Sequence, residues 1–223
     1  MKTLIIGSEE TIRFILLAPW HPKHRKLYGE WVENFKNIKY NNKKAVALCD
    51  FDGEGPSHVL NRSLHKIRHF TMMDTYVNFM GVDDTMYPDT LQLVKDQIKA
   101  HGSPEWLYCS AMQNGERLIE AKKWDYKRLK NNCYISGGAV FVRLDVYLNR
   151  HFRDIVFGMA DWDMWLQIGK IYTPVVLPEI VAYNEVVGNS SVRPKPGTLK
   201  SIIYCRIKYP IGRLHRTIYD WFL

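Results

Sequence analysis

Three pairs of closely spaced aspartates are the residues of this 223-residue chain whose type and spacing could do chemistry. The pairs are Asp50 with Asp52, Asp83 with Asp84, and Asp161 with Asp163. Each of the first two pairs follows a short apolar run of the kind that forms a buried strand. Carboxylates at the ends of neighbouring strands can share a hard cation such as Mg²⁺ or Mn²⁺, which in turn neutralises a diphosphate. The competing interpretation is that aspartate is simply a common turn residue after a strand.

The elements that would position these acids alternate between strands and helices. Three short apolar runs predict strands, and three segments with apolar residues recurring at helical spacing predict helices. The strands are expected at residues 14–18, 45–49 and 76–82, and the helices at residues 26–35, 59–67 and 88–102. Pro19 and Pro22 are expected to end the first strand. This alternation predicts an α/β fold with a parallel sheet covered by helices.

The second half of the chain predicts an antiparallel part. Residues 107–112 and 116–119 flank the dipeptide Asn114-Gly115, which is the strongest short signal for a hairpin. A further strand is expected at residues 139–142 and a short helix at residues 161–168, which carries the third pair of acids.

Four longer patterns follow one another along the chain. They are GPSHVLNRSL at residues 55–64, NFMGVDDTMYPDTL at residues 78–91, ISGGAVFVR at residues 135–143 and ADWDMWL at residues 160–166. In order and spacing they resemble the "GxsxARNxGl", "LDxDD…yPdtL", "isGgavlfrr" and "EDwDlwl" segments of the family 2 glycosyltransferases. The resemblance covers about residues 14–168. It implies a Rossmann-like GT-A fold, in which a mixed, mostly parallel central sheet is flanked by helices and carries a small antiparallel hairpin on the acceptor side.

The resemblance also implies an activity. Enzymes of this family move a sugar from a nucleoside diphosphate sugar, here with UDP-sugars favoured, to a hydroxyl group of a glycan or other acceptor. The expected cofactor is Mn²⁺ or Mg²⁺, and the expected course is a single displacement with inversion. An aspartate acting as general base would deprotonate the acceptor hydroxyl.

Individual residues take roles from the same resemblance. Asp161 would be the general base, and Asp83, as the last acid of the family's D-x-D motif, would hold the metal together with Asp84. The expected nucleotide-sugar contacts are Pro19, Trp20, His21, Asp50, Asp52, Asn61, Val82 and Asp83. The expected acceptor-side residues are Gly137, Gly138, Trp162 and Asp163.

Several positions depart from the family pattern. Gly81 stands where the first acid of D-x-D is expected, Leu60 replaces the arginine of "ARN", and Ala160 replaces the glutamate of "ED". Residues 19–22 resemble the family's "PTYN" only weakly. These differences bear on the identity of the donor more than on the fold.

Charge and composition leave other interpretations open. The formal net charge of +8 suits a phosphorylated ligand, an anionic membrane surface or nucleic acid, and it also serves solubility alone. A sugar-nucleotide pyrophosphorylase would need a Gly-rich phosphate loop after the first strand, which residues 19–22 do not provide. A basic nucleic-acid-binding module has no recognisable motif in its support, so we expect no nucleic-acid partner.

The overall organisation is expected to be one catalytic domain, residues 1–198, with a nucleotide-sugar half at about 13–90 and an acceptor half at about 104–190. Residues 199–223 form a basic amphipathic segment, suited to peripheral contact with an anionic membrane or, equally, to packing on the domain. No apolar stretch is long enough to span a bilayer, and Glu9 and Glu10 interrupt the N-terminal apolar run, so we expect a cytoplasmic protein. The widely spaced cysteines, expected to be free thiols, are Cys49, Cys109, Cys133 and Cys205.

Overall fold

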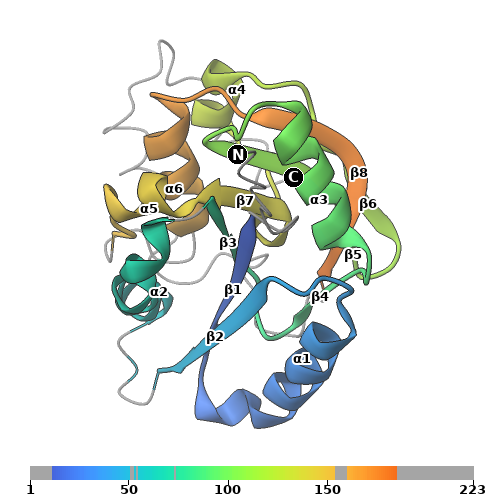
Figure 1. Ribbon diagram of the computed structural model, residues 1–223, viewed down its shortest axis with the longest axis vertical. Helices are drawn as coiled ribbons and strands as arrows, with labels where there is room; N and C mark the ends of the chain where they lie inside the picture. Colours follow the sequence, from blue (N-terminus) through green and yellow to red (C-terminus); the bar gives the residue numbers. More distant parts are fainter. Residues whose placement is uncertain (1–11, 51–52, 54, 73, 154–159, 185–223) are drawn as a thin grey trace, which may run out of the picture.

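A mixed β-sheet with helices on both faces forms the described part of the protein (Figure 1). The computed structural model describes residues 12–50, 53, 55–72, 74–153 and 160–184. Its first elements are β1 (Arg13–Trp20), the 3-10 turn η1 (Pro22–His24), α1 (Arg25–Asn37), β2 (Lys43–Cys49), α2 (Pro56–Ile67), η2 (Arg68–Met72), β3 (Thr75–Phe79), β4 (Asp84–Met86) and α3 (Thr90–Ala100). The remaining elements are β5 (Trp106–Gln113), β6 (Arg117–Ile119), α4 (Tyr126–Asn131), η3 (Gly137–Ala139), β7 (Val140–Arg143), α5 (Leu144–Leu148), α6 (Ala160–Gly169) and β8 (Val175–Asn184).

The strand order in the sheet is β2-β1-β3-β7-β5-β8-β4, and β6 pairs with β5. Pairing is parallel between β1 and β2, β1 and β3, and β5 and β8. It is antiparallel between β3 and β7, β5 and β7, β4 and β8, and β5 and β6. The predicted mixed α/β sheet flanked by helices is therefore confirmed, but antiparallel pairing is not confined to a small hairpin. Because η3 lies beside the carboxyl end of β3, β7 must run back along β3 in the opposite direction.

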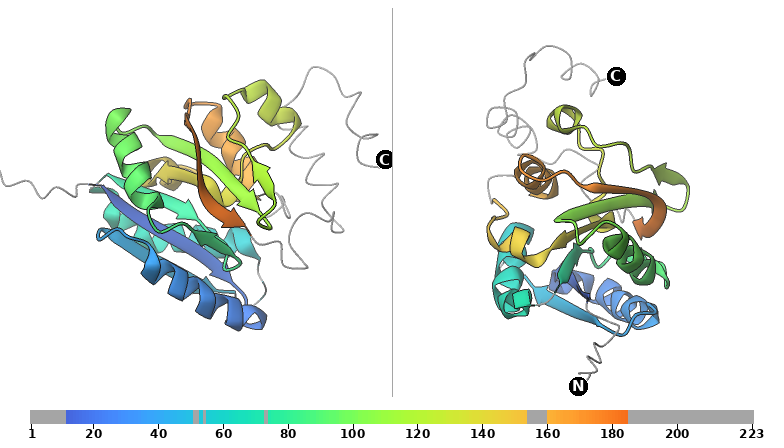
Figure 2. Two further views of the ribbon diagram at one scale, coloured as in Figure 1. Left: turned by 90° about the vertical axis from the view of Figure 1, so that its right-hand side faces the viewer. Right: turned by 45° about the horizontal axis from the view of Figure 1, so that its top comes forward.

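Successive side chains along the strands pack alternately into two separate hydrophobic cores, one on each face of the sheet. In β1, Ile15 and Leu17 point to the face covered by α2, α4, α5 and α6, whereas Phe14 and Leu16 point to the face covered by α1 and α3. All four side chains have no exposed area. Burial on both faces explains why the strand is a continuous apolar run, without the alternation of a half-exposed strand. The two helix layers are visible on either side of the sheet in Figure 2.

The hairpin forms where the sequence predicts it. β5 and β6 pair with Ala111 opposite Ile119, and the turn between them carries Asn114 at φ 52° and Gly115 at φ 70°. Both values lie in the left-handed region that asparagine and glycine tolerate best, which is the reason Asn-Gly predicts this turn.

Several element boundaries differ from the prediction. β1 continues through Pro19 to Trp20, because the proline lies near the strand end and its neighbour Trp20 still accepts a hydrogen bond from the Asp50 N–H at 2.7 Å. The strand expected at residues 76–82 ends at Phe79, and Asp84 begins β4, which pairs with β8. β8 was not predicted. It contains Pro178 at an irregularity in its pairing with β5, and a proline inside a strand hides the strand pattern.

Three other expectations concern cysteines, membrane spans and the tail. Cys49, Cys109 and Cys133 are free, as predicted. Among the described residues, no helix combines the length and the apolar character needed to cross a bilayer. Asp52, Cys205 and the segment 199–223 lie outside the described residues.

Candidate active site

The carboxyl ends of β1, β2 and β3 meet at one edge of the sheet. β1 and β2 are paired up to Trp20 opposite Cys49, and β1 and β3 up to Leu17 opposite Phe79. The chain segments that leave these strands therefore begin side by side. In open α/β sheets this edge is where ligands bind.

A cavity of about 300 Å³ lies at this edge. Its size is within the range of small-molecule sites. The lining residues are Pro19, Trp20, His21, Lys23, His24, Leu27, Asp50, Pro56, Val59, Gly81, Val82 and Asp83. They come from the end of β1 and the η1 turn, from the starts of α1 and α2, and from the loops that follow β2 and β3.

Most of the residues predicted to bind the nucleotide sugar are brought together here. Those that line the cavity are Pro19, Trp20, His21, Asp50, Val82 and Asp83. Asn61 is placed elsewhere: its amide donates to the Phe152 carbonyl at 2.8 Å and accepts from the Phe152 N–H at 3.0 Å. These two bonds tie α2 to the segment that follows α5, which is a structural role for this side chain.

Sequence reasoning did not single out the basic side chains of the η1 turn. Lys23 and His24 line the cavity, yet neither belongs to a pattern that predicts a site. The available signal was the basic run His21-Pro22-Lys23-His24-Arg25-Lys26 directly after the first strand. A basic run is more often a solvated surface, so it carried little weight without the fold.

Asp50 has a structural partner as well as a place in the cavity wall. Its carboxylate accepts a hydrogen bond from the Gly55 N–H at 3.0 Å. Gly55 has φ 96°, a conformation that side-chain-bearing residues rarely adopt, and it directly precedes α2. Asp50 therefore anchors the loop that leads into α2 and keeps the cavity wall in place.

An aromatic stack supports the Trp20 wall of the cavity. The Trp20 ring stacks on Tyr28 of α1 with centroids 4.6 Å apart and planes 12° apart. The Tyr28 ring lies nearly parallel to the Trp31 ring at a centroid distance of 6.4 Å, and the Trp31 ring lies nearly parallel to the Phe35 ring at 6.2 Å. One face of Trp20 is thus covered by α1, and this packing restrains the orientation of the ring.

Asp83 and Asp84 converge on the space beside Gly81. A Cβ atom placed on Gly81 would lie 2.5 Å from Oδ1 of Asp83 and 3.1 Å from Oδ2 of Asp84. The second oxygen also accepts a hydrogen bond from the Gly81 N–H at 2.9 Å. The two carboxylates therefore occupy the space into which the first acid of a D-x-D motif would project.

The electrostatic environment makes this pair costly without a cation. Burial raises the pKa of Asp83, while its own backbone and the charge of His24 lower it. Burial and then the charge of Asp83 raise the pKa of Asp84 to about 7, against the opposing effect of the Gly81 N–H. In the part of the chain that the structure describes, no ion pair reaches either carboxylate.

The donor set fits a hard divalent cation that is shared with a ligand. Within the described residues no group of three or more His, Cys, Asp or Glu side chains could enclose a metal ion. Two converging carboxylates are nevertheless what Mg²⁺ commonly takes from a protein, because substrate phosphates and water complete its six ligands. Asp83 and Asp84 would hold such an ion, and their mutual repulsion would be relieved by it.

Gly137 and Asp161 approach each other from two separate segments. A Cβ atom on Gly137 would lie 3.3 Å from Oδ2 of Asp161. The buried Asn78 of β3 donates to the carbonyls of Gly138 at 2.8 Å and Val140 at 2.9 Å. These bonds place the Gly137–Gly138 segment beside the carboxyl half of β3. Asp161 therefore lies at the same edge of the sheet as Asp83.

Asp161 combines exposure with a partly desolvated carboxyl group. The residue is exposed, yet the protein packed around its carboxyl raises the pKa, against the opposing effect of hydrogen bonds from backbone N–H groups. One of these comes from the Trp162 N–H at 2.8 Å. A carboxylate that is more basic than usual is suited to proton abstraction.

The two residues after Asp161 point into the protein. Trp162 is 3% exposed, and its indole N–H donates to the Leu129 carbonyl at 2.7 Å, so its ring belongs to the core between α6 and α4. Asp163 is fully buried and pairs with Arg153 at 3.3 Å and with the Gln167 amide at 2.9 Å. Both were expected on the acceptor side, and the structure buries both side chains in contact with other parts of the protein.

Comparison with known proteins identifies the fold. No family model and no curated protein sequence matches this chain. Among solved structures, S. aureus TarS matches with a TM-score of 0.62 and 14% identity over 78% of this chain and 37% of the TarS chain. TarS 1–349 in complex with UDP-GlcNAc matches with a TM-score of 0.63 and 13% identity over 90% of this chain and 68% of that chain. This chain thus spans little more than a third of the longer TarS chain and shares its GT-A-like fold.

Proposed function

We propose that this protein is a glycosyltransferase of the hexosyltransferase type. It transfers a sugar from a nucleoside diphosphate sugar, with UDP-sugars favoured, to a hydroxyl of a glycan or other acceptor. The observation that carries the proposal is the cavity at the carboxyl edge of the sheet, bordered by Asp50 and Asp83, in a fold whose solved neighbours are glycosyltransferases. One of these neighbours was solved with UDP-GlcNAc bound.

The donor would lie in this cavity with its nucleoside toward Trp20 and Asp50. The Trp20 ring, restrained from behind by Tyr28, offers an aromatic surface to a base. Asp50, which already accepts from the Gly55 N–H, has further lone pairs for a base or ribose donor. Asp83, which lines the same cavity, would then face the diphosphate.

Asp83 and Asp84 would hold Mn²⁺ or Mg²⁺ together with the diphosphate. When bound, such an ion stabilises the negative charge that develops on the leaving diphosphate. The convergence of both carboxylates beside Gly81 supports this assignment, and so does their raised pKa.

Asp161 would take the proton from the acceptor hydroxyl. Its exposure and its raised pKa support this role, and its position against Gly137 would bring the acceptor to the edge where Asp83 lies. Because Asp163 is buried in an ion pair, Asp161 is the acid of this segment that an acceptor can reach. A single base without an enzymic nucleophile corresponds to inversion in one displacement.

A nucleotide screen by thermal unfolding tests the proposal. UDP, GDP and UDP-sugars are added to the protein in Mn²⁺, in Mg²⁺ and in EDTA. We expect UDP to raise the free energy of unfolding only with a metal, by about 2.7 kcal/mol at a hundredfold excess over its dissociation constant. The matched control is Asp96→Asn, an exposed acid of α3 that bonds only to Gln92 and should respond like the wild type.

Two outcomes would contradict the proposal. If no nucleotide or nucleotide sugar stabilises the protein with either metal, the cavity is not a donor site. If stabilisation by UDP is equal in EDTA, the donor binds without a metal bridge, and Asp83 and Asp84 have another role. A positive screen leads to the measurement of UDP release from each stabilising donor.

A further inference from the structure

Among the described residues, the basic side chains that line the donor cavity come from one short stretch of the chain. Of the lining side chains, those able to carry a positive charge are His21, Lys23 and His24, all at the end of β1 or in η1. The residues that α2 contributes to the lining are Pro56 and Val59, which are apolar. The described cationic groups of the lining therefore come from the end of β1 and the η1 turn and not from α2.

α2 has cationic side chains, but none of them is among the residues that line the cavity. Leu60, the next residue after Val59, is 7% exposed and packs in the core with Leu64. The exposed basic residues Arg62 and Lys66 lie outside the cavity lining. A ligand with two phosphates in this cavity meets no cation from α2, so its remaining charge must be balanced from elsewhere.

His24 is within electrostatic reach of the acid that faces the cavity. Burial raises the pKa of Asp83, and the charge of His24 is one of the two effects that oppose this rise. His24 is half-buried and Lys23 is exposed. The η1 turn therefore contributes an exposed lysine and a partly enclosed imidazole to the cavity lining, and the charge of the imidazole reaches Asp83.

Local hydrogen bonds fix the shape of the turn. His21 caps it: its Nδ1 accepts from the Lys23 N–H at 3.3 Å, and its carbonyl accepts from the His24 N–H at 2.8 Å. Pro22 holds the first position of the turn, and the Arg25 N–H donates to its carbonyl. The backbone of the turn is thus preorganised and needs little further ordering when a ligand binds.

We infer that Lys23 and His24 bind the diphosphate of the donor. The inference rests on the proposed function and specifies how this chain holds the phosphates in addition to the metal pair. Lys23 would act as a point charge on a phosphate oxygen, and the His24 ring would donate an N–H to the same group. The nucleoside would be held independently of both residues.

The test separates phosphate binding from nucleoside binding. Dissociation constants for uridine and UDP are measured in Mg²⁺ for the wild type, Lys23→Met and His24→Gln. Each substitution should weaken UDP by about tenfold, which corresponds to the loss of one charge-assisted hydrogen bond, and should change uridine by less than twofold. Inorganic pyrophosphate should displace UDP from the wild type. The same concentrations of pyrophosphate should not displace uridine from Lys23→Met or His24→Gln.

Lys26→Met is the matched control. Lys26 lies three residues after Lys23, its side chain is 91% exposed, and it pairs with Glu30 on the surface of α1. It carries the same charge as Lys23 but does not line the cavity. UDP affinity should be unchanged in this variant, and Lys23→Arg should recover most of the affinity that Lys23→Met loses.

Each remaining result has a definite meaning. If Lys23→Met and His24→Gln bind UDP as tightly as the wild type, the inference is overturned and the proposed function stands. If uridine and UDP weaken equally, the turn holds the nucleoside, and the inference is again overturned. If the wild type binds neither compound, the proposed function fails and the inference fails with it.

Discussion

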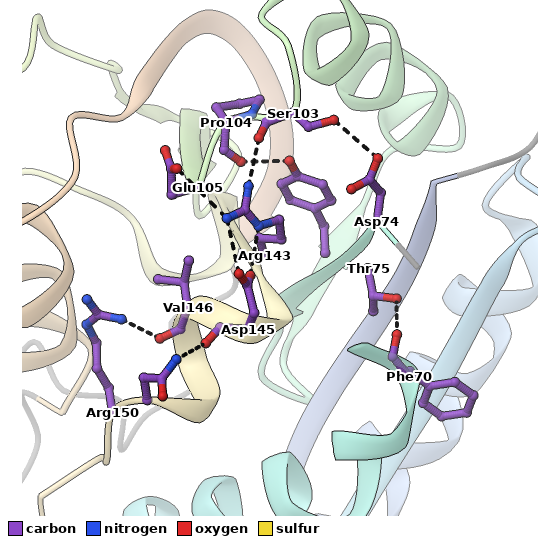
Figure 3. Close-up of polar contacts among 12 residues, drawn as sticks. Phe70, Asp74, Thr75, Ser103, Pro104, Glu105, Arg143, Asp145, Val146 and Arg150 are labelled. Carbon is purple, nitrogen blue, oxygen red and sulfur yellow. Dashed lines mark hydrogen bonds and ion pairs between the residues drawn. The ribbon is translucent and has the colours of Figure 1, made fainter. Parts of the chain in front are cut away.

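β3 has a cluster of charged groups at each end, and the two clusters differ in how their acids are paired. At its amino end, Arg143 binds Asp145 through two bonds of 2.7 and 3.1 Å, donates to the Ser103 carbonyl at 3.0 Å and lies 3.8 Å from Glu105 (Figure 3). The hydroxyl of Ser103 in turn donates to Asp74 at 3.2 Å. Every acid in this cluster has a cationic or hydroxyl partner.

At the carboxyl end of β3, no ion pair or side-chain hydroxyl from the described residues reaches Asp83, Asp84 or Asp161. Asp84 accepts from a backbone N–H and has Asp83 as its neighbour, and Asp161 accepts from the backbone N–H of Trp162. Burial raises the pKa of all three, whereas the bond to Asp145 is the largest cause of the raised pKa of Arg143, which stabilises its charged form. Paired charges of the first kind support the fold, and unpaired acids of the second kind are maintained at a cost that a ligand can offset.

The largest expected effect is on transfer by Asp161→Asn. The substitution removes the proposed base without altering the donor cavity, so transfer at saturating donor should fall by about 10²–10⁴-fold while UDP affinity is unchanged. The measurement is the rate of product formation together with a UDP titration. Full activity in this variant would show that the unpaired acid of α6 is not the base.

Asp163→Asn is the control on the same helix. It breaks a buried pair with Arg153, so it should lower the free energy of unfolding by on the order of 2 kcal/mol and leave most of the transfer activity. Thermal unfolding and the same rate assay measure both effects. An inactive Asp163→Asn with an active Asp161→Asn would move the base to position 163.

Asp83→Asn should remove the stabilisation that UDP provides in the presence of metal. That stabilisation is about 2.7 kcal/mol at a hundredfold excess over the wild-type dissociation constant. Asp84→Asn should have a smaller effect, because one of its oxygens already accepts the Gly81 N–H. Without nucleotide and metal, Asp83→Asn should not lower stability, since it removes one of two repelling charges. A greater loss in Asp84→Asn would assign the main metal contact to position 84.

Arg143→Met tests the paired cluster at the amino end of β3, where we expect a loss of stability without a loss of UDP binding. It leaves Asp145 and Glu105 without their cation, so it should lower the free energy of unfolding by about 1–3 kcal/mol. The dissociation constant of UDP should stay within twofold of the wild type. Urea unfolding and a UDP titration test the two parts, and a large loss of UDP binding in a folded variant would show that the two ends of β3 are coupled.

The smallest expected effect is on the pH dependence of transfer. A general base must be deprotonated, and burial raises the pKa of Asp161 above the ordinary 3.8. The rate at saturating donor and metal should therefore rise with pH through a midpoint above 3.8, and the residual rate of Asp161→Asn should lack this rise. A wild-type midpoint at or below 3.8 would show that Asp161 is not desolvated when the donor is bound.

Local patterns in the sequence were sufficient for most of the framework. The apolar runs predicted β1, β2 and β7, the helical spacing predicted α1, α2, α3 and α6, and Asn114-Gly115 predicted the hairpin. Each of these signals depends on a few neighbouring residues. The sequence also predicted that Asp50 and Asp83 follow neighbouring strands. In the sheet β1 lies between β2 and β3, and both acids still line one cavity because the three parallel strands end at a common edge.

The tertiary structure alone decided which polar side chains are available for chemistry. Asp161 and Asp163 are two residues apart on one helix, yet the first is exposed against Gly137 and the second is buried against Arg153. Lys23 and His24 belong to no pattern that predicts a site, and only the fold places them in the lining of the cavity. The reason is that the environment of a side chain depends on residues distant in sequence. The local spacing of apolar and polar residues does not show which distant residues those are.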